Sequence, residues 1–210
     1  MHRRAFIAAV LAAAALAAPL AAVAAPPILP PPPDAEDKAL VDKAAAYLDG
    51  LGQMHGHFLQ TDARGTVTQG ELYLSRPGKA RFDYQSPASL LVVSDGRYVL
   101  VYDRRLKTFD RYPLGATPLA LFLQRHVRLD ENVVVTRVDR FAGGFALTVR
   151  DGKKQAQGQI ELTFNTMPMA LRQWTITDAQ GARTTIRISD LEPVANLDPS
   201  LFVLDRPGSR

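Results

Sequence analysis

The sequence predicts a mainly β protein, a single-domain, incomplete (half-closed) antiparallel β-barrel of about ten to eleven strands with a helical lid over an apolar cavity. From residue 53 onward, apolar and polar residues alternate with a period of two in successive short runs. Turn residues rich in glycine separate these runs. A sheet of that size must curl or close. Two further segments have helical spacing and one apolar face each. The simplest arrangement packs these helices against the concave, apolar side of the sheet.

The composition fits one exported domain and excludes several kinds of chemistry. The chain has 210 residues, of which 47% are hydrophobic, enough for a sizeable core. It contains 0 cysteines, which excludes zinc–thiolate sites, a cysteine nucleophile, a redox role and a cysteine-linked lipid anchor. The formal net charge of +4 lies partly in the first residues and does not indicate a nucleic-acid partner.

Residues 1–24 have the pattern of a signal peptide. Arg3 and Arg4 form a positive n-region, residues 6–20 are apolar, and residues 22–24 read Ala-Val-Ala, a small-residue cleavage site. A membrane anchor is the weaker alternative, because the apolar run is short and interrupted by a proline. Without the two arginines, 23 basic residues face 21 acidic ones, a net charge of about +2.

Residues 25–37 are expected to form a proline-rich tether, and residues 38–210 the folded domain. The helix signals begin already at Asp34, where acidic residues favour a first turn. Gly50 and Gly52 are expected to end this helix. Its apolar stripe consists of Leu40, Val41, Ala44, Ala45, Leu48 and Leu51.

Strands are predicted wherever the period-2 pattern continues between turn signals. Asp95-Gly96 is a two-residue hairpin signal between two such runs. The predicted strands are residues 53–62, 67–76, 79–85, 89–94, 97–104, 107–112, 133–140, 144–150, 159–166, 169–178 and 182–191.

A second, short helix is predicted over residues 117–126. Thr117 is suited to the N-cap and Pro118 to the first helical position. The helix presents a compact apolar face made of Leu119, Phe122 and Leu123.

Candidate catalytic and metal-binding residues are few. His55 and His57 share one face of a strand, but the sequence offers no third ligand, so we expect surface histidines and no metal site. His126 is expected to complement the dipole of the short helix. Glu71 and Asp83 are interpreted as solvent-facing charges rather than a catalytic pair. No G-x-S-x-G, P-loop or H-E-x-x-H motif is present, so the sequence predicts no enzyme and no cofactor.

Arg76 stands out because it continues the parity of Leu72 and Leu74, where a buried apolar residue is expected. A guanidinium keeps its proton at ordinary pH, so inside the barrel it must find acceptors. The alternative is an arginine that ends its strand at the rim and is solvated.

Several segments together make the chain resemble the LolA family of periplasmic outer-membrane lipoprotein carriers. The resemblance runs from about residue 38 to residue 207. Its most specific part is the G-x-L-x-L-x-R-P run, followed by S-D-G and then Y-D. The segments are FLQ (58–60), GELYLSRPGKARFDY (70–84), LLVVSDGRYVLVYD (90–103), TPLALFL (117–123), LRQWTITDAQGARTTIRI (171–188) and LDPSLFVLDRP (197–207).

The resemblance implies a soluble periplasmic chaperone, exported by a cleaved signal peptide. It would take the acyl anchor of lipoproteins from an inner-membrane lipoprotein-releasing ABC transporter and carry it to the outer membrane, where a receptor of the same fold can accept it. A monomer without nucleic-acid partners is expected. The proline tract is a departure from the family's pattern.

The resemblance also implies the site. Arg76 would be a lid latch that hydrogen-bonds backbone carbonyls of the lid. The acyl-chain cavity would be lined by Leu72, Leu74, Phe82, Tyr84, Trp174 and Ile176, and the underside of the lid by Leu40, Leu119, Phe122 and Leu123. For Trp174, plain core packing is an equal alternative.

Two other functions stay open at this point. One is a periplasmic lipid- or lipoprotein-binding sensor or regulator of similar fold. The other is an enzyme on the same fold, since fold does not fix function. An enzyme would need a polar cluster in the cavity, which the apolar strand parities do not favour.

Overall fold

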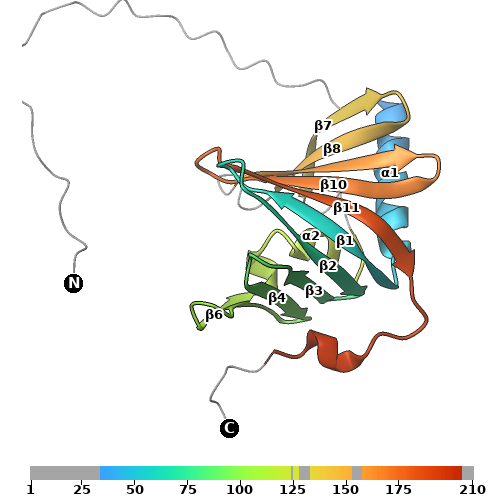
Figure 1. Ribbon diagram of the computed structural model, residues 1–210. Coiled ribbons are helices and arrows are strands. Elements are labelled where there is room, and N and C mark those ends of the chain that lie inside the picture. Colours follow the sequence, from blue (N-terminus) through green and yellow to red (C-terminus); the bar gives the residue numbers. More distant parts are fainter. Residues whose placement is uncertain (1–33, 124, 128–132, 153–157, 205–210) are drawn as a thin grey trace, which may run out of the picture.

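The computed structural model describes residues 34–204 except 124, 128–132 and 153–157, and of Phe122 and Asp151 only the backbone (Figure 1). The predicted signal peptide, residues 1–24, and the proline tract lie outside the described residues. Residues 35–37, the end of the predicted tether, belong to the first helix.

A single antiparallel sheet of 11 strands forms the body of the protein, in the order β6-β5-β4-β3-β2-β1-β11-β10-β9-β8-β7. The first and last strands of the chain are neighbours in its middle, and the edges β6 and β7 do not pair, so the barrel stays open. This confirms the predicted fold class. The strands are β1 (Gln53–Thr61), β2 (Val67–Ser75), β3 (Lys79–Tyr84), β4 (Leu90–Asp95), β5 (Tyr98–Asp103), β6 (Thr108–Pro113), β7 (Val133–Phe141), β8 (Gly144–Asp151), β9 (Gln159–Thr166), β10 (Met169–Thr177) and β11 (Arg183–Pro193).

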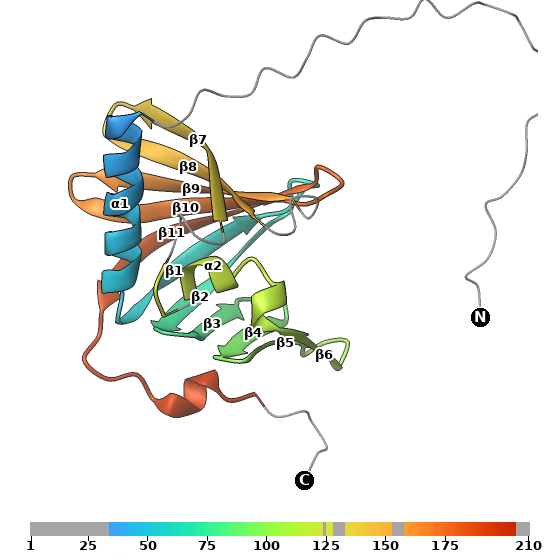
Figure 2. The same ribbon diagram turned by 180° about the vertical axis from the view of Figure 1, so that it is seen from behind.

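The helix α1 (Ala35–Gly50) lies across the concave side of β7 to β11 (Figure 2). It begins as predicted, because Asp34 and Asp37 form a reciprocal capping box at its first turn. Its apolar stripe buries Ala44 and Leu48 completely. No helix in the described part of the chain is both long and apolar enough to cross a membrane.

The second helical segment differs from its prediction. A 3₁₀ turn, η1 (Leu114–Ala116), comes first, and α2 (Ala120–Leu123) is only four residues long. Thr117 does not cap α2. Its hydroxyl donates instead to the carbonyl of Leu114 at 2.8 Å, and its backbone N–H donates to the same carbonyl at 2.9 Å, so Thr117 closes η1.

The β4–β5 hairpin forms one residue later than predicted. The turn residues are Gly96 and Arg97, and Gly96 takes a φ of 100°, a conformation that favours glycine. The Asp95 carboxylate accepts from the backbone N–H groups of Arg97 and Tyr98, each at 2.7 Å, and so fixes the turn from outside.

A C-terminal 3₁₀ turn, η3 (Pro199–Phe202), covers the convex side of β3 and β4. Phe202 packs against Leu91 and Val93, the outward-facing residues of β4, in a small second core. Arg81 on β3 donates to the carbonyl of Leu201 at 3.2 Å. Strand β4 is therefore apolar on both faces.

Candidate functional site

The concave side of the sheet holds one continuous apolar core. It includes the predicted cavity residues: Leu72, Leu74, Phe82 and Trp174 are buried, and Tyr84 and Ile176 are half-buried. Phe82 is the centre of an edge-on ring cluster, its centroid 5.4 Å from Phe58 and 6.1 Å from Trp174. These aromatic side chains pack on one another in the core, and in that sense we call the structure closed.

The lid residues reach the same core. Leu123 is fully buried, while Leu119 and Leu40 are partly buried against the core. Phe122 lies on α2, but its side chain is outside the described residues. One backbone hydrogen bond ties α2 to the β2–β3 turn, from the Gly78 N–H to the Leu123 carbonyl at 2.7 Å.

Arg76 lies at that turn, and its side chain is only 4% exposed. Its Nη2 donates to Oδ1 of Asp49, in the last turn of α1, at 3.3 Å. Burial lowers the pKa of Arg76, and the hydrogen bond to Asp49 opposes this shift. Arg76 therefore faces inward, as its parity predicts, and a carboxylate is one of its partners. A bond from Arg76 to lid carbonyls stays a prediction.

Asp49 joins three elements. Besides Arg76, its Oδ1 accepts the backbone N–H of Val127 at 2.9 Å, and its Oδ2 lies 4.0 Å from Nδ1 of His126. The end of α1, the β2–β3 turn and the segment after α2 therefore meet at one carboxylate. His126 thus lies beside Asp49, with 72% of its side chain exposed.

Sequence reasoning missed Asp49, although a signal existed. A carboxylate in the last turn of a helix faces the negative end of the helix dipole, which is unfavourable without a compensating partner. The last turn of α1 contains no basic residue, so that partner had to come from elsewhere in the chain.

The β2–β3 turn, which carries Arg76, packs closely against the β4–β5 hairpin. Gly78 has a φ of 85°, and a Cβ atom there would lie 2.9 Å from the Cα of Gly96. The buried hydroxyl of Ser94 donates to the Gly78 carbonyl at 2.6 Å. Because the β2–β3 and β4–β5 turns pack this closely, the backbone beside Arg76 has little freedom to move.

Two hollows border the described surface, and neither is the predicted cavity. One, of about 520 Å³, lies beside the lid and is lined by Pro77, Gly96, Leu114, Ala120, Leu123 and Arg125, among others. The other, of about 560 Å³, is lined largely by outward-facing residues of the middle strands, including His57, Leu59, Gln69, Arg172, Arg187 and Ser189.

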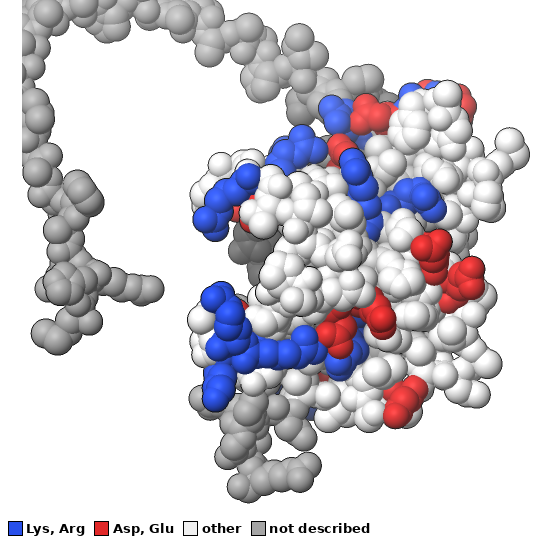
Figure 3. All heavy atoms as spheres, viewed as in Figure 1, with Lys and Arg blue, Asp and Glu red and all other residues white. Residues whose placement is uncertain are grey.

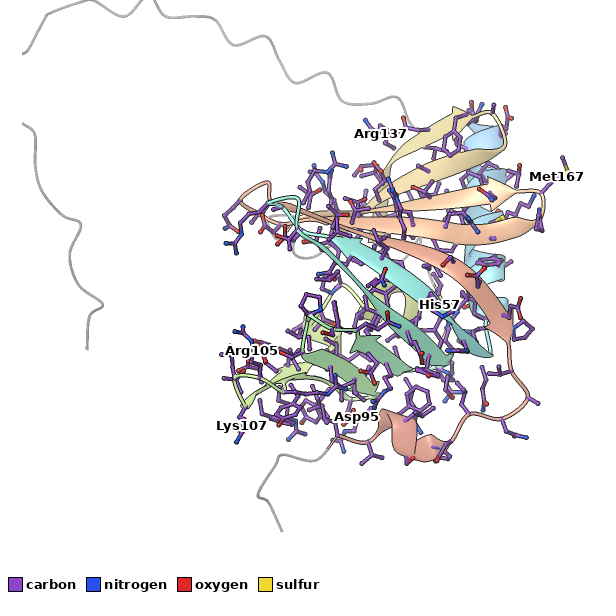
Figure 4. The ribbon with its side chains drawn as sticks, viewed as in Figure 1. His57, Asp95, Arg105, Lys107, Arg137 and Met167 are labelled. Carbon is purple, nitrogen blue, oxygen red and sulfur yellow. The ribbon has the colours of Figure 1, made fainter. Side chains whose placement is uncertain are left out.

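The histidine and carboxylate candidates form surface contacts. His57 lies over the middle strands (Figure 4), with Nδ1 3.8 Å from Oδ2 of Asp190. His55 stacks on Tyr73 at 4.5 Å and lies 3.7 Å from Glu71. Among the described residues, no three potential metal ligands cluster.

Glu71 and Asp83 are directly paired across β2 and β3, yet each has its own partner. Glu71 accepts the hydroxyl of Tyr73, which helps to raise the pKa of that tyrosine to about 12. Asp83 accepts from Arg104 at 2.7 Å and Arg81 at 2.6 Å. Burial acts to raise the pKa of Asp83, but these bonds outweigh it and the pKa is lowered. The pair belongs to a surface charge network.

Acidic and basic side chains alternate in small groups over the face shown in Figure 3. Arg105 and Lys107 project from the β5–β6 turn (Figure 4). The charge on this face is thus dispersed, as is usual for a solvated surface.

Comparison with known proteins identifies relatives over most of the chain. The sequence model of the family described as "Outer membrane lipoprotein carrier protein LolA" matches residues 49–205. An outer-membrane lipoprotein carrier protein of Methylobacillus flagellatus is 30% identical over 161 residues, covering 72% of this chain and 78% of the relative. One from Chromohalobacter salexigens is 31% identical over 165 residues, covering 76% and 72%.

A solved structure supports the fold alone. A DUF1329 family protein from Desulfovibrio piger superimposes with a TM-score of 0.50 at 12% identity, covering 79% of this chain and 96% of that chain.

Proposed function

Because the chain belongs to the LolA family of outer membrane lipoprotein carrier proteins, we propose that it binds the acyl anchor of lipoproteins and carries them through the periplasm. The proposal makes it a non-enzymatic chaperone. An inner-membrane lipoprotein-releasing ABC transporter would load it, and an outer-membrane receptor could unload it. No observation on the described residues favours the sensor alternative.

The observation that carries the proposal is an apolar interior closed by a very short cover. Leu123 buries completely, but α2 has only four residues and is tied to the β2–β3 turn through a backbone hydrogen bond. Helices this short are not stable without their tertiary contacts. A ligand that replaces those contacts can therefore displace the cover.

The free energy of burying an acyl chain is larger than that of the hydrogen bond at Arg76, as a latch that opens for cargo requires. Burying one long acyl chain contributes on the order of 10 kcal/mol, at about 0.8 kcal/mol per CH₂. A hydrogen bond to a charged group contributes about 1.5–3 kcal/mol. Asp49 binds both Arg76 and the backbone N–H of Val127, in the segment after α2, and these bonds together can therefore hold the empty carrier closed without preventing entry of cargo.

On this basis the residues have distinct roles. Arg76 and Asp49 latch the closed state, Leu119 and Leu123 form the underside of the cover, and the ring cluster around Phe82 separates to admit acyl chains. When cargo leaves, the latch re-forms and lowers the free energy of the empty state. Release then needs no fuel on the carrier itself.

The test is native mass spectrometry of residues 25–210 after incubation with inner-membrane vesicles containing the transporter and a labelled triacylated lipoprotein. Wild type is compared with Arg76→Leu and with Arg172→Leu, a matched control at an exposed arginine. We expect a one-to-one soluble complex for all three. Arg76→Leu should retain its cargo when acceptor membranes are added, because the closed empty state is no longer stabilised.

Absence of a complex with every protein would rule out the carrier function. Cargo release by Arg76→Leu at the rate of the control would leave the carrier function in place and remove the latch.

A further inference from the structure

Strands β3, β2, β1 and β11 are neighbours in the sheet (Figure 1). The residues on their inner faces change from apolar to polar toward the same end of the sheet. Their apolar members belong to the core beneath the lid. Residues two apart on a strand share a face, so the next inward position on each strand can be read directly. These pairs are Phe58 and Gln60 on β1, Phe82 and Tyr84 on β3, and Ile186 and Thr184 on β11. On β2 the inward position next to Leu72 is Gly70, and the polar Thr68 follows two residues further along the same face.

Strand register places the polar members at nearly the same level. Gln60 pairs with Thr68, and Tyr84 pairs with Gly70, two residues along β2 from Thr68. Thr184 lies on β11 two residues from Ile186, the partner of Gln60. We call Gln60, Thr68, Tyr84 and Thr184 the polar collar. It lies at the opposite end of β2 from Arg76, so the collar and the latch are far apart.

A hydrogen bond organises the centre of the collar. The Tyr84 hydroxyl donates to Oε1 of Gln60 at 2.7 Å, while the Tyr84 ring meets Phe58 edge-on at 4.8 Å. Burial raises the pKa of Tyr84 to about 12, so its hydroxyl stays protonated at neutral pH. A Cβ atom at Gly70 would lie 2.9 Å from the Phe58 ring, so glycine leaves room for this contact.

The fold does not need this bond. Strands β1 and β3 are each joined to β2 by a complete backbone ladder. Phenylalanine at position 84 would keep the ring packing and bury no hydroxyl. Placing polar atoms at the margin of an apolar core carries a desolvation cost unless they are paired. Tyr84 and Gln60 meet this condition by pairing with each other, and the glutamine amide N–H groups give this level donors that a ligand with acceptor groups can engage.

We propose that the polar collar binds the ester linkages of a diacylglycerol group, while its acyl chains occupy the apolar interior beneath the lid. This rests on the acyl-binding function proposed above and names the part of the anchor that is recognised. An ester carbonyl only accepts hydrogen bonds. The glutamine amide carries two N–H donors in addition to the oxygen that Tyr84 engages. The cargo polypeptide would leave at the collar end, on the solvent side of the glycerol.

A comparison of ester and ether lipids tests the collar directly. The probes are a glycerol diester and the glycerol diether with chains of equal length, which differ only in the carbonyl groups. Trp174 is the single tryptophan and lies against Phe82, so its fluorescence reports entry of either lipid into the core. The proteins are wild type, Tyr84→Phe, Gln60→Leu and the control Tyr47→Phe. Tyr47 is a residue of α1 whose ring packs edge-on against Phe164.

We expect wild type and Tyr47→Phe to bind the diester about 3- to 10-fold more tightly than the diether, the value of one neutral hydrogen bond. In Tyr84→Phe and Gln60→Leu this ratio should fall to about one, with diether affinity unchanged. The unchanged diether affinity also shows that the variants are folded.

Equal affinities in wild type, or a preference that survives both substitutions, would overturn the collar and leave acyl binding intact. Binding of neither lipid by wild type would overturn acyl binding and the collar together.

Discussion

The two halves of the concave side are covered in different ways. Over β7 to β11 lies α1 (Figure 2), 16 residues long, with a capping box at its start and two fully buried side chains. Over β1 to β5, the described part of the chain places the short η1 and α2, three and four residues long. Arg140 of β7 binds Asp34, Glu36 and Asp37 at the start of α1. In α2, Leu123 is the one fully buried residue among the side chains described, and Ala120 and Leu121 are partly buried against the core.

The interiors under the two covers differ as well. Beneath α1, Phe145 and Phe164 stack face to face at 5.2 Å, and Tyr47 of α1 closes on Phe164. Beneath α2, Phe58 and Phe82 meet edge-on. The two covers are thus held in different ways, and on the proposed function only the second is exchanged for a ligand. Each prediction below tests this division.

The largest effect is expected at Phe164, which is fully buried. Phe164→Ala should lower the free energy of unfolding by about 3–5 kcal/mol, because it opens a cavity that the tightly packed α1 cannot fill. Phe82→Ala is the matched change in the other half and should cost about 3 kcal/mol, since the short cover can relax inward. Urea unfolding measures both. A larger loss for Phe82→Ala than for Phe164→Ala would contradict the division.

The covers themselves can be compared through Leu48 of α1 and Leu123 of α2, each fully buried. Leu123→Ala should cost about 2 kcal/mol, and Leu48→Ala more, within the usual range of about 2–5 kcal/mol. In wild type, the Gly78 amide, which bonds the Leu123 carbonyl, should exchange with solvent through a local opening. Amides within α1 should exchange more slowly by hydrogen-exchange measurements. Equal rates would mean that α2 opens only when the whole protein unfolds.

The latch should give a smaller effect on stability. A double-mutant cycle with Arg76→Met and Asp49→Asn should yield a coupling of about 1 kcal/mol, below the full value of a charged hydrogen bond because Asp49 is partly exposed. The same urea measurements supply the four free energies. A coupling near zero would show that the two side chains lie close without stabilising the closed state.

The smallest effect is expected on the convex face, where Asp83 bonds Arg104 and Arg81. These bonds lower the folded-state pKa of Asp83 below its ordinary 3.8. Its contribution is therefore present above that ordinary value and is lost as pH falls through the lowered folded-state pKa. Asp83→Asn should remove this part of the acid dependence, less than about 1 kcal/mol for such a partly exposed pair.

That substitution should leave lipid exchange unchanged, because these ion pairs do not touch the lid. Unfolding at a series of pH values and exchange of a fluorescent lipid are the two measurements. A change in exchange would show that the convex face takes part in opening.

Most of the sheet could be predicted from the sequence because its strands follow one another along the chain and most of them alternate apolar and polar residues. Val67–Ser75 and Lys79–Tyr84 lie within a residue of their predicted bounds. Parity also placed Arg76 and Tyr84 on the inner side. Their roles as latch and cavity residues stay predictions, since position alone does not establish them.

The partners of these residues could not be predicted, because they come from distant parts of the chain. Asp49 is 27 residues from Arg76, and Gln60 is 24 residues from Tyr84. Thr117 was misassigned for a local reason. A threonine between two turns can accept from the N–H groups of the following helix or donate to a carbonyl of the preceding turn, and here its hydroxyl donates to the carbonyl of Leu114.

The open sheet has a further consequence, for association between copies of the chain. Unpaired edge strands are ready templates for another strand and therefore promote aggregation. Here β6 is short and contains Asp110, Arg111 and Pro113, and β7 is irregular between Val135 and Arg137. Charge, proline and a bulge each discourage strand addition. The protein thus keeps an unclosed barrel while both of its free edges disfavour the pairing that would join copies into larger assemblies.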